Sequence, residues 1–244
     1  MDATYPVCIA RRREEILARM ETALAVSGRG LADVELVAVS KTVGVEEVLA
    51  AADAGYRTFG ENRPQELVRK LAGLAEAPDA PQVRFDMIGN LQTNKINAVL
   101  GRVALIHSIG SRHLAEAVSS RVERRLAAGE MTGPQPVLLE VNVSGEASKA
   151  GFSPDELRAD IDALRGLCGI HIQGLMTMAP QGDKGVARAC FCALRELRDE
   201  LAAACGLPLP ELSCGMSEDF EEALMEGSTL VRLGRVVFDP AFAV

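Results

Sequence analysis

The stretch VELVAVSKTVGVEEVLAAADAGYRTFGEN (34–62) contains one complete unit of the fold. Residues 34–41 form a short apolar run rich in β-branched side chains, which is typical of a strand buried on both faces. Residues 45–55 carry apolar side chains at helical spacing and end in a glycine, and residues 56–62 resume a strand pattern. This order indicates two parallel strands joined by a helical crossover.

The same alternation continues along the chain. Further strands are expected over residues 83–90, 103–110, 136–144, 170–179, 211–217 and 228–238. Helices are expected over residues 9–27, 63–76, 92–100, 112–128, 153–167, 185–205 and 218–226. Eight strands separated by helices in 244 residues favour an α/β fold with a single (β/α)8 TIM barrel and an extra N-terminal helix, with residues 1–244 as one domain. An open, doubly wound sheet is the alternative, because periodicity alone does not show closure.

Composition excludes several classes of function. The formal charge of −8 and the aromatic share of 4% argue against a nucleic-acid partner, which needs positive surface and stacking side chains. No apolar run reaches the ~20 residues of a membrane span, and the N-terminus lacks the apolar stretch of a signal peptide. The six cysteines form no C-x-x-C pair and are too few for a disulfide framework. We therefore expect a cytoplasmic protein with reduced thiols.

Barrel enzymes carry their chemistry at the carboxyl ends of the strands. The residues expected there are rich in Lys, Asn, Ser, Gly and Arg and poor in carboxylates: 40–41, 60–62, 88–90, 108–110, 142–144, 177–178, 215–217 and 232–234. This composition favours an anionic, phosphorylated ligand over the paired acids of a glycosidase.

Lys41 is the most informative of these residues, because it closes an otherwise apolar strand and only five lysines occur in the chain. Its side chain is expected to point into the barrel mouth, where loss of water lowers the pKa of an ammonium group. A neutral lysine is the nucleophile that forms a Schiff base with a carbonyl compound. A lysine that reaches from the strand end into solvent fits its position equally well.

Met216, Ser217 and Gly234 fit a phosphate site. A glycine allows close approach of the backbone, a serine offers N–H and hydroxyl groups, and a helix is expected to begin near Glu218. An ordinary loop with a serine helix cap is the alternative. Suitable residues follow both the seventh and the eighth strand, where barrels commonly bind phosphate, and this favours the phosphate site.

Arg232 lies two residues before Gly234 and is expected to point into the barrel, where a charge needs a partner. A pyridine nitrogen is one such partner. A buried ion pair with Glu61 or Glu140 is the other, and the sequence does not separate them.

Together, seven stretches resemble the YggS/PROSC family of pyridoxal phosphate homeostasis proteins, in the family's order from residue 37 to residue 238. They are VAVSKT (37–42), AGYRTFGENRPQE (54–66), IGNLQTNK (88–95), VNVSGEASKAGF (141–152), GLMTM (174–178), LSCGMSEDFEEAL (212–224) and GSTLVRLGRVVF (227–238). The chain departs from the family at Asn90, where a histidine is usual, at Cys214, often methionine, and at Asp239, often glycine.

The resemblance implies a barrel like the N-terminal domain of alanine racemase, with pyridoxal 5′-phosphate (PLP) as the cofactor. It assigns the Schiff base to Lys41, the pyridine nitrogen contact to Arg232 and part of the pocket wall to Asn62. It assigns the phosphate to Ser217, Gly234 and Met216. Lys149 matches a family lysine near the cofactor entrance, which suggests a role in transfer.

The resemblance also implies a role in storing and delivering PLP inside the cell, with PLP-dependent apo-enzymes as candidate recipients. An amino-acid racemase is the alternative function, but its second acid–base group comes from a tyrosine on an additional domain, and only six residues follow Phe238. A class I aldolase would need carboxylates that the strand ends lack. We expect a monomer with negligible or weak racemase activity.

Overall fold

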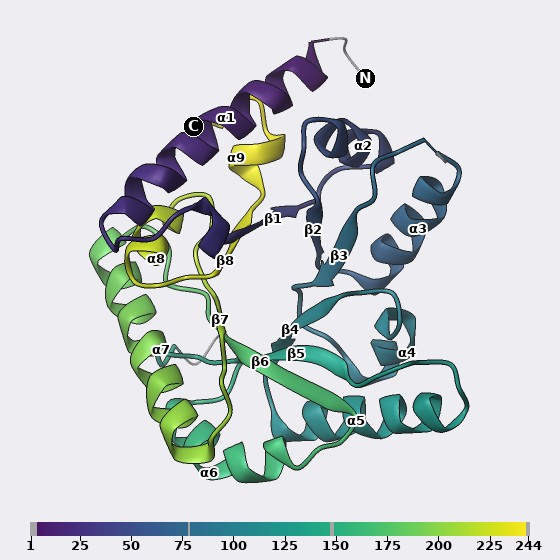
Figure 1. Cartoon of the computed structure of the whole chain (residues 1–244), viewed down its shortest axis with the longest axis vertical. Helices are drawn as coiled ribbons and strands as arrows, with labels where there is room; N and C mark the ends of the chain where they lie inside the picture. Colours follow the sequence, from purple (N-terminus) through teal and green to yellow (C-terminus); the bar gives the residue numbers. More distant parts are fainter. Residues whose placement is uncertain (1–3, 78, 147–148, 243–244) are drawn as a thin grey trace.

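The computed structural model describes residues 4–77, 79–146 and 149–242. Within them, eight parallel strands close into a barrel in which each strand pairs with the next and β8 pairs with β1 (Figure 1). The strands are β1 (Glu35–Val39), β2 (Thr58–Glu61), β3 (Arg84–Met87), β4 (Leu105–Ile109), β5 (Gln135–Glu140), β6 (Ile170–Met176), β7 (Glu211–Ser213) and β8 (Leu230–Leu233). The expected TIM barrel is confirmed, and the open sheet is excluded.

Helices surround the barrel, as Figure 1 shows. They are α1 (Tyr5–Ala25), α2 (Val45–Asp53), α3 (Pro64–Ala75), α4 (Ile96–Val99), α5 (Arg112–Ala127), α6 (Pro154–Arg165), α7 (Lys184–Cys205), α8 (Phe220–Met225) and α9 (Arg235–Phe238), with short 3₁₀ turns η1 (Leu31–Asp33) and η2 (Thr93–Lys95). The predicted start of α6 is confirmed: Ser153 caps the helix, Pro154 occupies its first position, and Glu156 bonds back to the Ser153 N–H.

The predicted eighth strand, residues 228–238, is wrong in its second half. The strand stops at Leu233, and residues 235–238 form α9. Val236 and Val237 have strand propensity, but they lie beyond the barrel rim and are fully buried in the helical turn. Tertiary burial therefore overrides local propensity here. Gly234 becomes the residue that joins β8 to α9.

The extra N-terminal helix α1 is confirmed, and it packs against α2, α8 and α9. Arg12, which is buried on this helix, donates hydrogen bonds to the backbone carbonyls of Val236, Pro240 and Phe242 at 2.7 to 3.0 Å. These bonds give both Nη groups of the buried guanidinium backbone acceptors, whereas its Nε has no partner among the described residues. They tie the end of the chain to its beginning beside the barrel mouth.

The inside of the barrel is mixed in polarity. One layer is a small apolar cluster made of Val37, Leu105, Leu138, Met176 and Leu230. Side chains alternate along a strand, so the residues two positions further on also point inward. These include His107, Glu140 and Arg232, all of which are buried. The interior toward the carboxyl ends of the strands therefore holds charged and polar groups.

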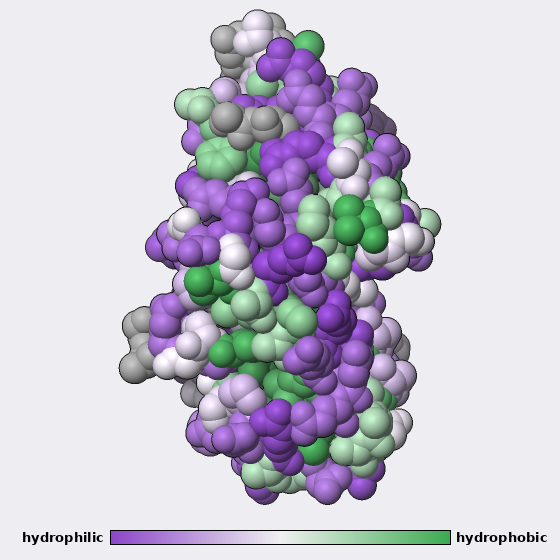
Figure 2. Space-filling view, turned by 90° about the vertical axis from the view of Figure 1, so that its left-hand side faces the viewer, coloured by the Kyte–Doolittle hydropathy of each residue, from purple (hydrophilic) through white to green (hydrophobic). Residues whose placement is uncertain are grey.

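The outer surface carries some apolar side chains. Figure 2 shows the side on which α1, α7 and α8 lie, where hydrophilic residues dominate and apolar residues lie between them. Large apolar side chains that are exposed include Val7, Val26 and Val186. In the described part of the chain, no helix combines the length and apolar character needed to cross a membrane.

Candidate functional site

A cavity of about 700 Å³ opens at the carboxyl ends of the strands, within the ~300–1,000 Å³ of typical small-molecule pockets. We call it the large cavity. Its walls come from the segments that follow β1, β2, β3, β6, β7 and β8, and from α1. Six of the seven predicted site residues line it: Lys41, Asn62, Met216, Ser217, Arg232 and Gly234. Lys149 does not line it.

Lys41 lies two residues beyond the end of β1, in a turn, and it is exposed. The expectation that burial would desolvate this ammonium group is therefore wrong. The residue before it, Ser40, is fully buried and anchors the turn. The Ser40 hydroxyl donates to Glu61 at 2.6 Å, and the buried Lys70 ammonium donates to both the Ser40 carbonyl and the Glu61 carboxylate. This network fixes the backbone from which Lys41 extends into the large cavity.

Asn62 follows β2 directly and presents an unsatisfied group. Its side-chain Oδ1 is buried and has no hydrogen-bond partner among the described residues. A buried acceptor without a partner costs about 1–3 kcal/mol, so such atoms usually mark a ligand or an ordered water. Because Asn62 lines the large cavity, a ligand with a hydrogen-bond donor fits this position.

Ser217 and Gly234 bring two loops together. The Ser217 hydroxyl accepts a hydrogen bond from the Val236 N–H at 3.3 Å, which links the loop after β7 to the start of α9. Among the described residues, neither the Ser217 N–H nor the Gly234 N–H donates to a protein acceptor. Both residues line the large cavity, so these free amides can bind an anion there.

The structure differs from the predicted phosphate site in two details. The helix expected near Glu218 begins at Phe220, so Ser217 is a loop residue and does not cap the helix. The Met216 N–H donates to Asp219 Oδ1 at 2.6 Å, so that amide is already used within the protein. Met216 contributes to the wall of the large cavity.

Arg232 projects inward from β8 and is 4% exposed. Its Nη1 donates to Ser213 Oγ at 2.6 Å, and its Nη2 donates to the Thr177 carbonyl at 3.0 Å. Neither predicted ion pair is present in the described structure, because Glu61 pairs with Lys70, and Glu140 lies outside ion-pair distance of Arg232. Burial lowers the pKa of Arg232, but a guanidinium stays charged at neutral pH. Three of its five N–H groups remain for further partners.

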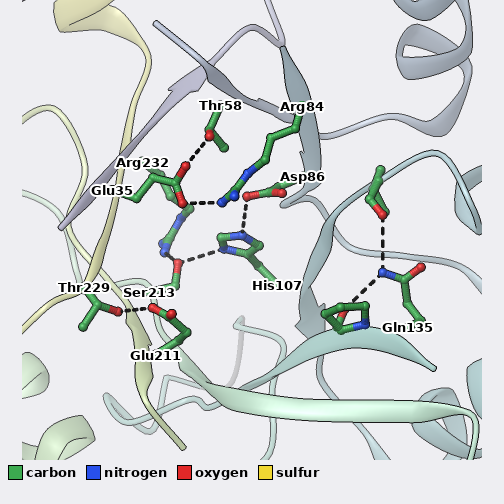
Figure 3. A network of polar contacts seen from close by, with 12 residues as sticks. Glu35, Thr58, Arg84, Asp86, His107, Gln135, Glu211, Ser213, Thr229 and Arg232 are labelled. Atoms are coloured by element: carbon green, nitrogen blue, oxygen red, sulfur yellow. Dashed lines mark hydrogen bonds and ion pairs between the residues drawn. The ribbon is translucent and has the colours of Figure 1, made fainter. Parts of the chain in front are cut away.

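A chain of buried polar groups from three other strands positions Arg232 (Figure 3). Asp86 Oδ2 lies 3.2 Å from His107 Nε2, and His107 Nδ1 lies 2.8 Å from Ser213 Oγ. Burial lowers the pKa of His107 and so favours the neutral ring, although the neighbouring Asp86 acts in the opposite direction. A carboxylate can only accept, so we assign the proton to Nε2. Nδ1 then accepts from the Ser213 hydroxyl, whose oxygen accepts from Arg232.

Lys149 lies in the loop after β5 and is not among the residues that line the large cavity. Its ammonium contacts Glu146 at 3.3 Å and the carbonyl of Met178 at 3.2 Å. Met178 lines the large cavity, so Lys149 lies behind its wall. Asn90, one of the departures from the family, lines a different cavity and is not among the residues that line the large one.

Sequence reasoning missed several residues. Arg19 of α1 lines the large cavity and donates two hydrogen bonds of 3.0 Å each to the Glu221 carboxylate. His107, Asp86 and Ser213 were missed because nothing in their local pattern separates them from other strand residues. An inward-pointing polar residue on a buried strand is the available signal, and alternation along each strand reveals it only when the strand bounds are known.

Comparisons with family models, curated proteins and solved structures all find similar proteins over most of the chain. The model of the alanine racemase N-terminal domain matches residues 15–240. A pyridoxal phosphate homeostasis protein from Aquifex aeolicus (strain VF5) is 37% identical over 228 residues, which cover 93% of this chain and 96% of that protein. PipY of Synechococcus elongatus PCC7942, solved with PLP bound, is 34% identical, with a TM-score of 0.78 over 94% of this chain and 99% of that one. The structure of an unknown protein from Bifidobacterium adolescentis is 39% identical, with a TM-score of 0.88 over 98% and 97% of the two chains.

Proposed function

Because this chain belongs to the family of pyridoxal phosphate homeostasis proteins, we propose that it binds PLP in the large cavity as a Schiff base with Lys41 and takes part in PLP storage and delivery. The observation that carries the proposal is the convergence of Lys41, Asn62, Ser217, Arg232 and Gly234 on that one cavity. These residues come from four separate strand ends, and only a ligand at the barrel mouth gives them a common use.

The residues fit the chemical groups of PLP. The free amides of Ser217 and Gly234 and the Ser217 hydroxyl suit the phosphate. The inward guanidinium of Arg232 would donate to the pyridine nitrogen, and Asn62 Oδ1, which has no partner among the described residues, would accept from a ring substituent. Lys41 supplies the amine at the rim, where an exposed side chain can meet an incoming aldehyde.

The polar chain behind Arg232 favours holding PLP over using it as a catalyst. Bound PLP supplies an electron sink, and that property depends on a protonated ring nitrogen. A guanidinium is a permanent donor and gives up no proton, so it leaves the nitrogen unprotonated. Ser213, His107 and Asp86 hold it in that orientation.

The two tyrosines of the chain lie outside the large cavity. Tyr5 donates to the Phe238 carbonyl at 3.2 Å, and burial raises its pKa to about 12. Tyr56 is 3% exposed, and burial raises its pKa further. A racemase needs acid–base groups on both faces of the substrate, so we expect negligible alanine racemization. Sustained turnover of L-alanine to D-alanine by the purified protein with PLP would contradict this expectation.

The absorbance spectrum of the purified protein tests the attachment. We expect a band near the visible that Lys41→Ala removes and the matched variant Lys95→Ala, whose lysine lies outside the large cavity, retains. Borohydride reduction followed by peptide mapping should place the added mass on the Lys41 peptide. A protein that stays colourless with added PLP, or a label on another lysine, would overturn the proposal.

Delivery is tested separately. The PLP-loaded protein, mixed with an apo-enzyme that uses PLP, should restore that enzyme's activity faster than the same concentration of free PLP does. We propose that this occurs in the cytoplasm from a monomer, and that Lys149, behind the wall of the large cavity, assists the exchange. Equal rates in the two reactions would mean that the protein stores PLP without delivering it.

A further inference from the structure

A second cavity of about 600 Å³ lies where the segments after β3, β4 and β5 meet. It shares no lining residue with the large cavity. Because the strands follow one another around a closed barrel, these segments form a different sector of the mouth from the loops that carry Ser217 and Gly234. The second cavity is therefore a separate binding space on the same face of the barrel.

Glu140 lines this second cavity from the end of β5. It is 4% exposed, and Leu138, two residues earlier, packs inside the barrel, so Glu140 also points inward. Within the described residues its carboxylate has no hydrogen bond and no ion pair. Two other buried carboxylates inside the barrel mouth do have partners: Glu61 pairs with Lys70, and Asp86 contacts His107 through Oδ2, although its Oδ1 has none among the described residues.

The other lining groups do not supply a countercharge. Exposed parts of the wall are formed by the amides of Asn90, Gln92 and Asn94 and by the imidazole of His113. Among the residues that the structure describes, no lysine or arginine lines the second cavity. Arg232 acts on Glu140 only through space, because its hydrogen bonds within the described residues go to Ser213 and Thr177. A buried carboxylate without a partner is costly, so the space in front of it suits a cation that donates hydrogen bonds.

We propose that the second cavity binds a small amine, with its ammonium group on the Glu140 carboxylate and its polar remainder against the amide side chains of the wall. A ligand that also carries a carboxylate is disfavoured, because no positive side chain of this cavity could receive it. The binding is non-covalent and goes beyond the proposed PLP function. Neither site requires the other to exist.

Saturation-transfer NMR with ethanolamine as the probe tests the site, because this method detects weak binding of small molecules. The full-length protein is first treated with borohydride, so that an added amine cannot exchange with a cofactor held on Lys41. Ethylene glycol, which has the same size and no charge, and glycolate, which is an anion, serve as comparison probes. We expect transfer to ethanolamine only.

Glu140→Gln keeps the shape of the side chain and removes its charge, so it should weaken ethanolamine binding by at least about tenfold. Glu130→Gln, which removes an exposed carboxylate outside the second cavity, should leave binding unchanged. Absence of transfer to ethanolamine in the wild type, or equal transfer in Glu140→Gln, would overturn the proposal. Such a result would identify Glu140 as a buried acid that stays protonated, and the PLP assays on Lys41 would be unaffected.

Discussion

Replacing Lys70 by methionine should strongly destabilise this barrel. The Lys70 ammonium and the Glu61 carboxylate form an ion pair in which both side chains are 1% exposed. Lys70→Met keeps the volume of the aliphatic stem but leaves Glu61 with only the Ser40 hydroxyl at 2.6 Å and the Asn62 N–H at 3.3 Å. The Glu61 carboxylate then becomes a buried charge without a cation beside it.

Breaking a buried pair in this way costs about 3–5 kcal/mol, against a total stability of about 5–15 kcal/mol for a typical protein. The double variant Lys70→Met, Glu61→Leu removes both charges and should recover most of the loss. Arg69→Met is the matched control on the same helix. Arg69 pairs with Glu66 at 2.6 Å, but its side chain is 66% exposed, so the loss should stay below about 1 kcal/mol.

Urea unfolding of the four proteins, followed by circular dichroism, gives the free energies. Lys70 also holds the Ser40 carbonyl, directly before Lys41, so PLP retention should fall in Lys70→Met as well. A loss below about 1 kcal/mol for Lys70→Met, or a double variant as unstable as the single one, would refute the assignment of a buried ion pair at this position.

Three further predictions follow from the described contacts. Gly215→Ala should lower the free energy of unfolding by about 1–3 kcal/mol and weaken phosphate binding, because φ at Gly215 is +92° and the new Cβ would lie 2.6 Å from a methyl group of α8. Gly30→Ala is the control in the same unfolding assay, since its new Cβ would have no neighbour within 4 Å and its φ is not positive. Burial raises the pKa of Cys214 to about 11, so at pH 8 it should resist alkylation while the exposed Cys168 reacts, as mass spectrometry of trapped peptides will show. Burial lowers the pKa of His107 in the folded state, so the unfolded state binds more protons as the pH drops below about 6.5, the usual pKa of a free histidine. The free energy of unfolding of the wild type should therefore fall below that pH, by up to about 1.4 kcal/mol per pH unit. An equal fall in His107→Gln would contradict the reasoning.

The sequence determined the elements that depend on local pattern. Alternation of apolar runs and amphipathic segments predicted all eight strands, because a parallel strand is buried on both faces and a covering helix on one. Ser153 and Pro154 predicted the start of α6 because capping is a contact over three residues. The positions of Lys41, Ser217 and Arg232 at strand ends followed from the same reasoning.

The tertiary structure decided the partners of the buried polar groups. His107 meets Ser213, 106 residues away, across the closed barrel. Lys70 meets the turn of Lys41 because β1 and β2 pair side by side and α3 packs against β2. Local propensity also failed at residues 235–238, where burial of Val236 and Val237 beside α1 favours a helical turn over a strand. Pairing in a closed barrel depends on contacts between strands that are distant in sequence, and the hydrophobic pattern of each strand carries no information about which charge it will face.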